Sequence, residues 1–247
     1  MLDDPLSLAL AVTAAFLVGV TKTGLPGIGS LTAVLMAAAV PGKYSVGLLC
    51  TVLLTGDFFA LRYYRHHGQV RVIFKLIPAM AVGIAAGAYV LHSLDDDMFR
   101  PALALVVVGL LALELLRRRG NAESFQGHPV IAVIVGFGAG FATTVANAAG
   151  AIMSVYLIML GLQKREFIGT ITWYYFIFNA LKIPVFMYIG VLPVEHLRYT
   201  IWLALPVALG AIVGAIIFRI TPQKLFDAIV LGTTAMGAAW LLISSFR

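Results

Sequence analysis

Charged residues and cysteines are scarce in this sequence of 247 residues. Only 11% of the residues are charged and 61% are hydrophobic, a composition far from that of a soluble globular domain. The one cysteine, Cys50, excludes an internal disulfide framework and a metal site built from several cysteines. A lone cysteine in a membrane segment is expected to be a small packing residue. The composition therefore predicts an integral membrane protein.

Enzyme signatures are also missing. The sequence contains no HExxH, no GxSxG and no phosphate-binding loop, so no catalytic residues and no cofactor are expected. His66 and His67 lie in a basic loop and do not indicate a metal site. The net charge of +6 would suggest nucleic acid as a partner of a soluble protein. Here the basic residues fall in short loops between apolar segments, which makes them a topology signal and argues against nucleic acid.

The chain instead has a series of apolar runs. Several of them are close in length to the about 20 residues that a spanning helix needs. They lack the short alternating segments of a β-barrel. A hydrophilic linker, residues 119–129, divides a first transmembrane repeat, residues 1–118, from a second, residues 130–247. The expected segments are Leu6–Val20, Leu31–Val40, Tyr44–Tyr64, Val70–Leu91 and Met98–Leu116 in the first, and Val130–Val145, Ala148–Leu160, Phe167–Tyr188, Leu197–Phe218 and Leu225–Ile243 in the second.

Two polar, glycine-rich stretches interrupt the apolar pattern at the same place in each half. The first is Gly19–Ser30, GVTKTGLPGIGS, and the second is Gly140–Ala151, GFATTVANAAGA. Glycine permits backbone conformations that other residues avoid, and Pro26 lacks a backbone N–H, so a continuous helix through the first stretch is not expected. Backbone groups freed at such a break are tolerated only inside protein or beside a hydrated cavity. Each break is therefore a candidate functional site.

The two halves also match residue by residue. Each contains three spanning segments and a broken pair that either re-enters or crosses twice, so each makes an odd number of crossings. Similar halves joined in this way lie in opposite orientations, as in many secondary transporters. The predicted fold is an all-α polytopic membrane protein with two inverted repeats. The matched pairs are Gly19 and Gly140, Thr23 and Thr144, Gly29 and Gly150, Lys43 and Lys164, Gly47 and Gly169, Asp57 and Asn179, Gly68 and Gly190, Gly83 and Gly210, Gly87 and Gly214, and Phe99 and Phe226.

The distribution of basic residues predicts the orientation. With the loop after Tyr64 in the cytoplasm, most basic residues lie inside, in agreement with the positive-inside rule. Asp3, Asp4 and Asp95–Asp97 then lie outside, and both termini are expected to be external. The first apolar run is expected to be retained, because the residues before it lack the positive charge of a secretory signal. The basic residues assigned inside are Arg62, Arg65, Arg71, Lys75, Arg117, Arg118, Arg119, Lys164, Arg165, Arg219 and Lys224, and those outside are Lys43, Arg100, Arg198 and Arg247.

Three ionisable residues are not assigned to a loop: Lys22 in the first break, and Asp57 and Lys182 within apolar segments. Each costs about 2.5 to 3.5 kcal/mol at membrane depth on insertion scales, so each is a functional candidate. For the two lysines, extension to the interface or a buried ion pair is the alternative. Asp57 is matched by the neutral Asn179 and is the candidate proton-coupling residue. Asn179 and Lys182 are expected to share one face of their helix with Thr172.

The two breaks together predict an anion site. Helix N-termini expose unpaired N–H groups and carry partial positive charge, so two helix starts that meet near mid-membrane would bind an anion, with Lys22 adding a full charge. Close helix packing is the alternative explanation of the glycines. The candidate substrate-binding residues are Thr21, Lys22, Thr23, Gly27, Gly29, Ser30, Thr143, Thr144, Asn147, Gly150, Asn179 and Lys182.

Three motifs occur in an order that resembles the TauE/SafE family of anion permeases, the exporters of sulfite and organosulfonates. They are Gly19-x-x-Lys-Thr-Gly-x-Pro-Gly27, Ala146-Asn-Ala-Ala-Gly150 and Lys164-Arg-Glu-Phe-x-Gly-Thr170, and the resemblance covers both halves. It implies a bacterial inner-membrane transporter of small sulfur-containing or carboxylate anions. Many members have runs of glycine at each break, where this chain has Gly-Ile-Gly and Ala-Ala-Gly, and this departure leaves the substrate open.

The sequence thus favours a multi-pass secondary transporter in the bacterial cytoplasmic membrane that exports a small anion such as sulfite or an organosulfonate with proton coupling. An anion channel with the same site, or a permease for another small carboxylate or sulfur anion, remains an alternative. An intramembrane enzyme or assembly subunit is a third class, disfavoured by the missing nucleophile and base. The expected partners are the anionic substrate and membrane lipid, and a homodimer is left open.

Overall fold

The computed structural model of the protein describes residues 2, 4–24, 29–93, 129–147, 149–222 and 225. All regular elements in these residues are helices, so the all-α prediction is confirmed for this part of the chain. Four helical stretches within it are long and apolar enough to cross a membrane: Pro5–Thr23, Tyr44–His67, Val70–Ser93 and Val194–Ile220. A shorter apolar helix covers Val130–Val145. The protein is therefore a polytopic helical membrane protein.

The helices follow the predicted segments closely. The first half contains α1 (Pro5–Thr23), α2 (Gly29–Ala39), α3 (Tyr44–Tyr64), the 3-10 turn η1 (Arg65–His67) and α4 (Val70–Ser93). The second half contains α6 (Pro129–Ala146), α7 (Gly150–Met159), α8 (Lys164–Tyr188), the 3-10 turn η3 (Val194–His196) and α9 (Leu197–Ile220). The segment predicted at 98–116 and most of those at 119–129 and 225–243 lie outside the described residues, as do Phe99 and Phe226.

Both predicted breaks are present. The first helix stops at Thr23 and the next begins at Gly29, while α6 stops at Ala146 and α7 begins at Gly150. Asn147 follows α6 with a φ of 51°, a left-handed conformation that asparagine tolerates better than most residues and that commonly ends a helix. The backbone at each break therefore leaves the helical path where the sequence predicted it.

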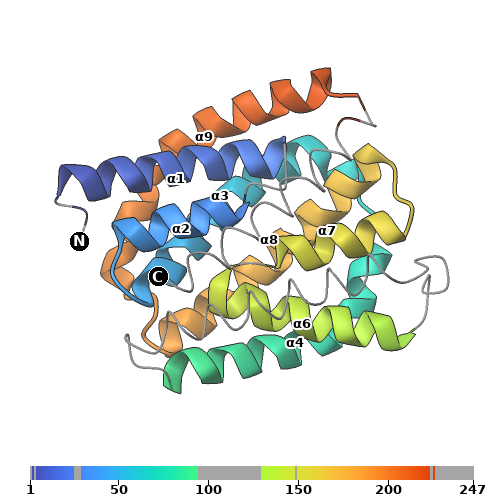
Figure 1. The fold of residues 1–247 in the computed structure, drawn as a ribbon, viewed down its shortest axis with the longest axis horizontal. Helices are drawn as coiled ribbons and strands as arrows, with labels where there is room; N and C mark the ends of the chain where they lie inside the picture. Colours follow the sequence, from blue (N-terminus) through green and yellow to red (C-terminus); the bar gives the residue numbers. More distant parts are fainter. Residues whose placement is uncertain are drawn as a thin grey trace.

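Glycines let helices from opposite halves touch through their backbones (Figure 1). Helix α1 lies against α9: a Cβ on Gly19 would stand 2.1 Å from the Val207 carbonyl oxygen, and one on Gly210 would stand 2.0 Å from that of Phe16. Helix α4 lies against α6 in the same way, because a Cβ on Gly83 would stand 2.2 Å from the Phe137 carbonyl oxygen. These three glycines therefore serve close helix packing.

Helices α3 and α8 form the central contact between the halves. A Cβ on Gly47 would stand 2.3 Å from the Val191 carbonyl oxygen, near one end of the pair. Near the other end, a Cβ on Gly169 would stand 2.6 Å from the Gly68 nitrogen. Since an early residue of α3 meets the end of α8, and the residues after α3 meet the start of α8, the two helices run antiparallel. They enclose the polar groups described below.

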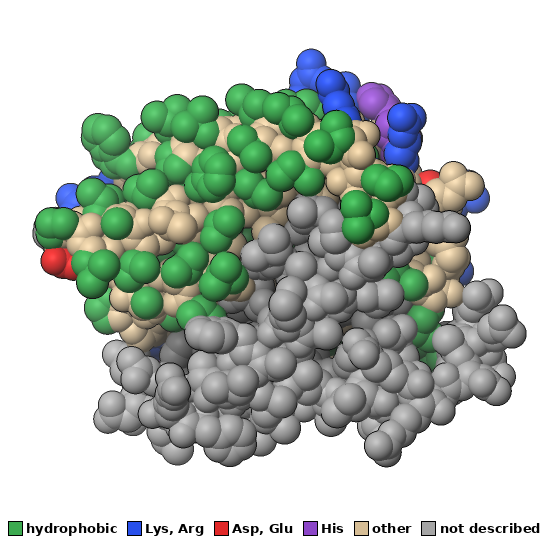
Figure 2. All heavy atoms as spheres, turned by 45° about the horizontal axis from the view of Figure 1, so that its top comes forward, with side chains coloured by type: hydrophobic (Ala, Val, Ile, Leu, Met, Phe, Trp, Pro, Cys, Tyr) green, Lys and Arg blue, Asp and Glu red, His purple; other side chains and the backbone are tan. Residues whose placement is uncertain are grey.

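The described surface is apolar along its length and charged at its ends. Figure 2 shows hydrophobic side chains over most of the described face, with basic and acidic side chains near its two sides. Large apolar side chains such as Phe58, Phe74 and Trp202 are 62% to 80% exposed, as expected for a surface that contacts lipid. One end holds Arg65, whose carbonyl oxygen accepts from Trp173 Nε1 at 3.0 Å.

The glycine contacts generate a stability prediction. In Gly140→Ala, the new methyl group would stand 2.4 Å from the Met80 carbonyl oxygen, whereas in Gly138→Ala it would meet nothing closer than Ile152 Cδ1 at 3.6 Å. We expect Gly140→Ala to lower the free energy of unfolding by about 1 to 3 kcal/mol, as in other overpacked cores. Thermal unfolding in detergent measures the effect. Gly138→Ala, two residues away on the same helix, is the control, and equal stability of both variants would contradict the packing argument.

Candidate functional site

A buried ion pair lies beside the first break. Lys22 is in the last turn of α1, and its Nζ lies 2.6 Å from Oδ1 of Asp57 on α3. The two residues are 8% and 0% exposed. An uncompensated charge at this depth is costly, so each group needs the other in the folded protein. Lys22 thus forms a buried ion pair and does not extend to the interface.

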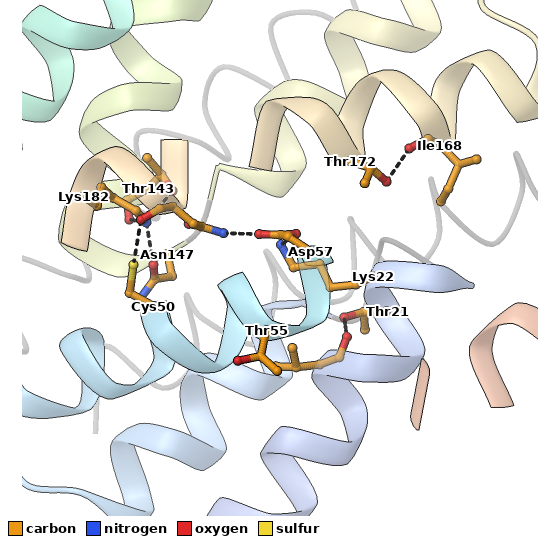
Figure 3. A network of polar contacts seen from close by, with 12 residues as sticks. Thr21, Lys22, Cys50, Thr55, Asp57, Thr143, Asn147, Ile168, Thr172 and Lys182 are labelled. Carbon is orange, nitrogen blue, oxygen red and sulfur yellow. Dashed lines mark hydrogen bonds and ion pairs between the residues drawn. The ribbon is translucent and has the colours of Figure 1, made fainter. Parts of the chain in front are cut away.

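The second oxygen of Asp57 binds the other half of the protein. Asn179 on α8 donates its Nδ2–H to Asp57 Oδ2 at 2.6 Å (Figure 3). One carboxylate oxygen therefore faces the Lys22 ammonium in the ion pair, and the other accepts a hydrogen bond from Asn179. The matched pair Asp57 and Asn179 thus meets directly between α3 and α8.

Lys182 is held in a different way. Its Nζ donates to the Thr143 carbonyl oxygen at 2.8 Å, to Thr143 Oγ1 at 3.0 Å and to Asn147 Oδ1 at 2.7 Å. The Asn147 amide is oriented by a second bond, from its Nδ2 to the Val46 carbonyl oxygen at 3.1 Å. All three ammonium protons thus have neutral acceptors at the second break, and Lys182 is fully buried.

Two further side chains join this network that the sequence did not single out for the site. Lys22 Nζ lies 3.7 Å from the centre of the Tyr175 ring, a cation–π contact. The Tyr175 hydroxyl lies close to the start of α7, because a Cβ added to Gly150 would stand 2.8 Å from the hydroxyl oxygen. Cys50 Sγ lies 3.6 Å from the Asn179 carbonyl oxygen. Tyr175 precedes Asn179 by four residues and Lys182 by seven, and this helical spacing was the available signal.

Three predicted threonines turn away from the network. Thr21 donates to the Val18 carbonyl oxygen at 3.0 Å and Thr144 to that of Gly140 at 2.9 Å. Thr23 Oγ1 lies between two carbonyl oxygens that can accept its proton, that of Gly19 in its own helix at 3.0 Å and that of Ala211 in α9 at 2.7 Å. Since a hydroxyl has one proton, these groups are not available as donors to an anion in this conformation. Thr172 likewise bonds its own helix, at Ile168.

The predicted site residues at the beginning of α2 remain predictions. Gly29 begins α2, but Gly27 and the Ser30 side chain lie outside what the structure describes, and so does Ala148 of the second break. The structure therefore leaves untested the expectation that the two helix starts meet.

The buried charges of the described residues do not cancel. Lys22, Asp57 and Lys182 are the charged side chains among those buried in the described ranges. Lys22 and Asp57 form a neutral pair, while Lys182 has only neutral acceptors. With both lysines protonated and Asp57 ionised, the cluster would carry one excess positive charge. Within the same ranges, no cluster of at least three His, Cys, Asp or Glu side chains could hold a metal ion.

Apolar helices long enough to cross a membrane, with buried charged side chains between them, are typical of a membrane transporter. The family model for the sulfite exporter TauE/SafE matches residues 11–241, and the chain belongs to this family. The resemblance noted from the three motifs is therefore confirmed over nearly the whole chain. Neither the curated proteins nor the solved structures contain a match to this sequence.

Proposed function

We propose that this protein is a secondary transporter that exports a small anion, such as sulfite or an organosulfonate, across the bacterial cytoplasmic membrane with proton coupling. The observation that carries the proposal is the buried Lys182, which has only neutral acceptors at Thr143 and Asn147, in a member of a sulfite exporter family. A desolvated anion needs positive charge and donors that are already in place. An anion channel, or a permease for another small carboxylate or sulfur anion, is the alternative.

The inverted repeat is supported by reciprocal packing. The first helix of each half lies against the last described helix of the other half, α1 on α9 and α6 on α4. The contacts correspond under the predicted pairing. Gly210 meets Phe16, as Gly83 meets Phe137, and Gly214 meets Val20, as Gly87 meets Phe141. A pseudo-two-fold relation between residues 1–118 and 130–247 explains all four contacts.

The directions of the helices agree with inversion. Contacts between Gly19 and Val207, and between Gly24 and Gly214, make α1 and α9 parallel, whereas the matched helices α3 and α8 run antiparallel. An antiparallel pair of matched helices is what a two-fold axis in the membrane plane produces. Asp57 and Asn179, which bond each other, then lie on that axis. A substrate at this point would be equally reachable from both sides, as alternating access requires.

The charged ends support the predicted orientation. Hydrogen bonds bring Gln69 to Glu166 and Lys164 to the end of α9, so the loops that carry Arg65, Arg165 and Arg219 lie at one end of the molecule. The opposite end contains Asp4, Lys43 and Arg198. The positive-inside rule assigns the more basic end to the cytoplasm.

The orientation predicts the accessibility of tags. A tag at either terminus should be reached by a membrane-impermeant reagent from outside, and a tag within 117–126 should be reached only after the membrane is opened, because an inverted repeat leaves both ends on one side. Labelling of cysteine tags in intact cells and in inverted vesicles makes the comparison, with Cys50 replaced by alanine to remove the background thiol. A cytoplasmic C-terminus would contradict the inverted repeat.

The anion site generates a test of transport. Lys182→Gln removes the uncompensated charge, so we expect at least tenfold weaker substrate affinity, or about 1.4 kcal/mol. Counterflow of radiolabelled sulfite in proteoliposomes, with sulfoacetate and taurine as competitors, measures it. Lys43→Gln, which removes a lysine of the outer end, is the matched control.

Two results would count against the proposal. If Lys43→Gln weakened binding and Lys182→Gln did not, the site would lie at the outer mouth. Downhill flux without any counterflow would favour the channel. A transporter exchanges one substrate molecule for another because its site faces one side at a time, whereas an open channel only lets the substrate run down its gradient.

Asp57 is the proposed proton-coupling residue. The groups that interact with it are Lys22 from α1, Cys50 from its own helix, and Tyr174, Tyr175, Asn179 and Lys182 from α8. Protonation of Asp57 would break the ion pair and leave the Lys22 ammonium without its counter-charge. Binding of a proton to Asp57 would therefore change the preferred position of Lys22. A proton-coupled transporter requires such a link between proton binding and the groups of its site.

The coupling proposal predicts the behaviour of Asp57→Asn. The amide keeps the shape of the carboxylate but cannot exchange a proton, so a pH gradient should no longer drive accumulation, while downhill exchange of substrate should continue. Proteoliposomes with an imposed pH gradient, compared with the same vesicles at equal pH, separate the two activities. Unchanged gradient-driven transport in the variant would make Asp57 a structural residue.

A further inference from the structure

We propose that the start of α7 binds the oxyanion head group of the substrate, and that the hydroxyls of Ser154 and Tyr175 donate hydrogen bonds to it. The inference rests on the proposed function of anion transport and gives the sulfonate, sulfite or carboxylate group of the ligand a place in the fold. It follows from two hydroxyl groups that lie on one face of a helix start inside the protein.

The start of α7 offers backbone donors within the protein. This helix begins at Gly150 and has ten residues, and Ala149 before it has no exposed surface. The first N–H groups of a helix have no acceptor within the helix, and they carry partial positive charge. Both properties favour an anion at this position. A helix start alone does not make a site, however, so the side chains around it decide.

Tyr175 of α8 brings a hydroxyl to this helix start. A Cβ added to Gly150 would stand 2.8 Å from the Tyr175 hydroxyl oxygen. Apart from the chain neighbours and the backbone of α7 itself, that oxygen is the one atom of the described residues within 4 Å of the added Cβ. The hydroxyl makes no hydrogen bond with the described part of the chain. Lys22 Nζ lies over the Tyr175 ring at 3.7 Å, and the hydroxyl is therefore available as a donor at Gly150.

Ser154 presents a second hydroxyl to the same face of α7. It follows Gly150 by four residues, so the two lie on one face, and side chains of a helix tilt toward its start. Ser154 is 1% exposed, and its Oγ has no hydrogen-bond partner. Other buried hydroxyls of this structure donate to their own helix, as Thr144 and Thr172 do. A buried hydroxyl without an acceptor is unfavourable, and an oxyanion bound at Gly150 would supply the acceptor.

The second break runs along α8, between this pair of hydroxyls and the proposed site lysine. Asn147, at the start of the break, accepts from Lys182 Nζ at 2.7 Å, and Gly150, at its end, meets Tyr175. Tyr175 and Lys182 are seven residues apart on α8, which is about two helical turns on one face. An anion at the start of α7 would thus lie along the same face of α8 as the Lys182 ammonium.

The first half does not repeat the two hydroxyls. Under the pairing of the halves, Ala33 matches Ser154 and Leu53 matches Tyr175. Neither residue carries a donor, whereas the glycine at the helix start is present in both halves as Gly29 and Gly150. The hydroxyl donors therefore belong to the second break, and the first break does not provide an equivalent pair.

Two variants remove these hydroxyls and keep the rest of the site. Tyr175→Phe retains the ring over Lys22, and Ser154→Ala retains the helix. Each should raise the sulfite concentration that half-saturates counterflow at least tenfold, measured with radiolabelled sulfite in proteoliposomes that contain the full-length protein. Tyr188→Phe removes a hydroxyl of the same helix at a residue that is 92% exposed, and it should leave that concentration unchanged.

Thermal unfolding in detergent separates ligand binding from a role in the fold. Sulfite should raise the Tm of the wild-type protein, because a ligand of the folded state stabilises it. Both variants should lose most of this rise. Without sulfite, Ser154→Ala should unfold at the wild-type temperature or above it, since the hydroxyl that it removes is buried without a partner, and Tyr175→Phe should unfold at the wild-type temperature.

The outcomes distinguish the inference from the function beneath it. Half-saturation at the wild-type sulfite concentration in both variants, in a protein that Lys182→Gln does weaken, would overturn the head-group site and leave anion transport intact. Weaker binding together with a lower Tm in the absence of sulfite would make the hydroxyls structural and would also overturn it. If the wild-type protein exchanged neither sulfite nor an organosulfonate, the proposed function would fail and the inference with it.

Discussion

The structure depends on the burial of one carboxylate. Asp57 has no exposed surface, and a charge in that position is tolerated only with partners that are close and correctly oriented. Lys22 supplies the counter-charge from the end of α1, and Asn179 supplies a hydrogen bond from α8. Three helices from both halves are thus fixed to a single side chain. The end of α1 at Thr23 places Lys22 next to this carboxylate, in the last helical turn.

The glycine contacts make this polar centre possible. Hydrogen bonds of 2.6 to 3.1 Å between side chains of different helices require helices that approach closely, and in lipid no hydrophobic effect drives them together. Gly19, Gly83, Gly140 and Gly210 let backbone meet backbone, so dispersion forces act over the full contact. The same four residues tie each half to the other, since α1 rests on α9 and α6 on α4.

The two halves hold their lysines in opposite ways. In the first half, the lysine is on the broken helix and its acceptor, Asp57, is on α3. In the second half, Lys182 is on α8 and its acceptors are at the end of the broken helix, at Thr143 and Asn147. In each half, a lysine thus joins the helix before the break to the next long helix, α1 to α3 and α6 to α8. The acceptor is a charged carboxylate in the first half and a set of neutral groups in the second. Lys22 therefore has a carboxylate partner, whereas Lys182 has none among its three acceptors.

The sequence by itself determined the helices, both breaks and the residues at membrane depth. These features depend on local chemistry: runs of apolar residues form long helices, and the helices before the two breaks end at Gly24 and at Asn147. The chain also determined that Lys22, Asp57 and Lys182 would be functional candidates, because their cost in lipid is a property of each side chain alone.

Only the tertiary structure decided the partner of each polar group. Lys22 and Asp57 come from separate helices, and Tyr175 reaches Lys22 from the other half of the chain. The hydroxyl of Thr23, expected to face an anion, lies instead between a carbonyl oxygen of its own helix and that of Ala211, because α9 lies close enough to offer that carbonyl. A polar side chain bonds to whichever acceptor the packing of distant helices brings within about 3 Å. The sequence around that side chain does not determine which acceptor this is.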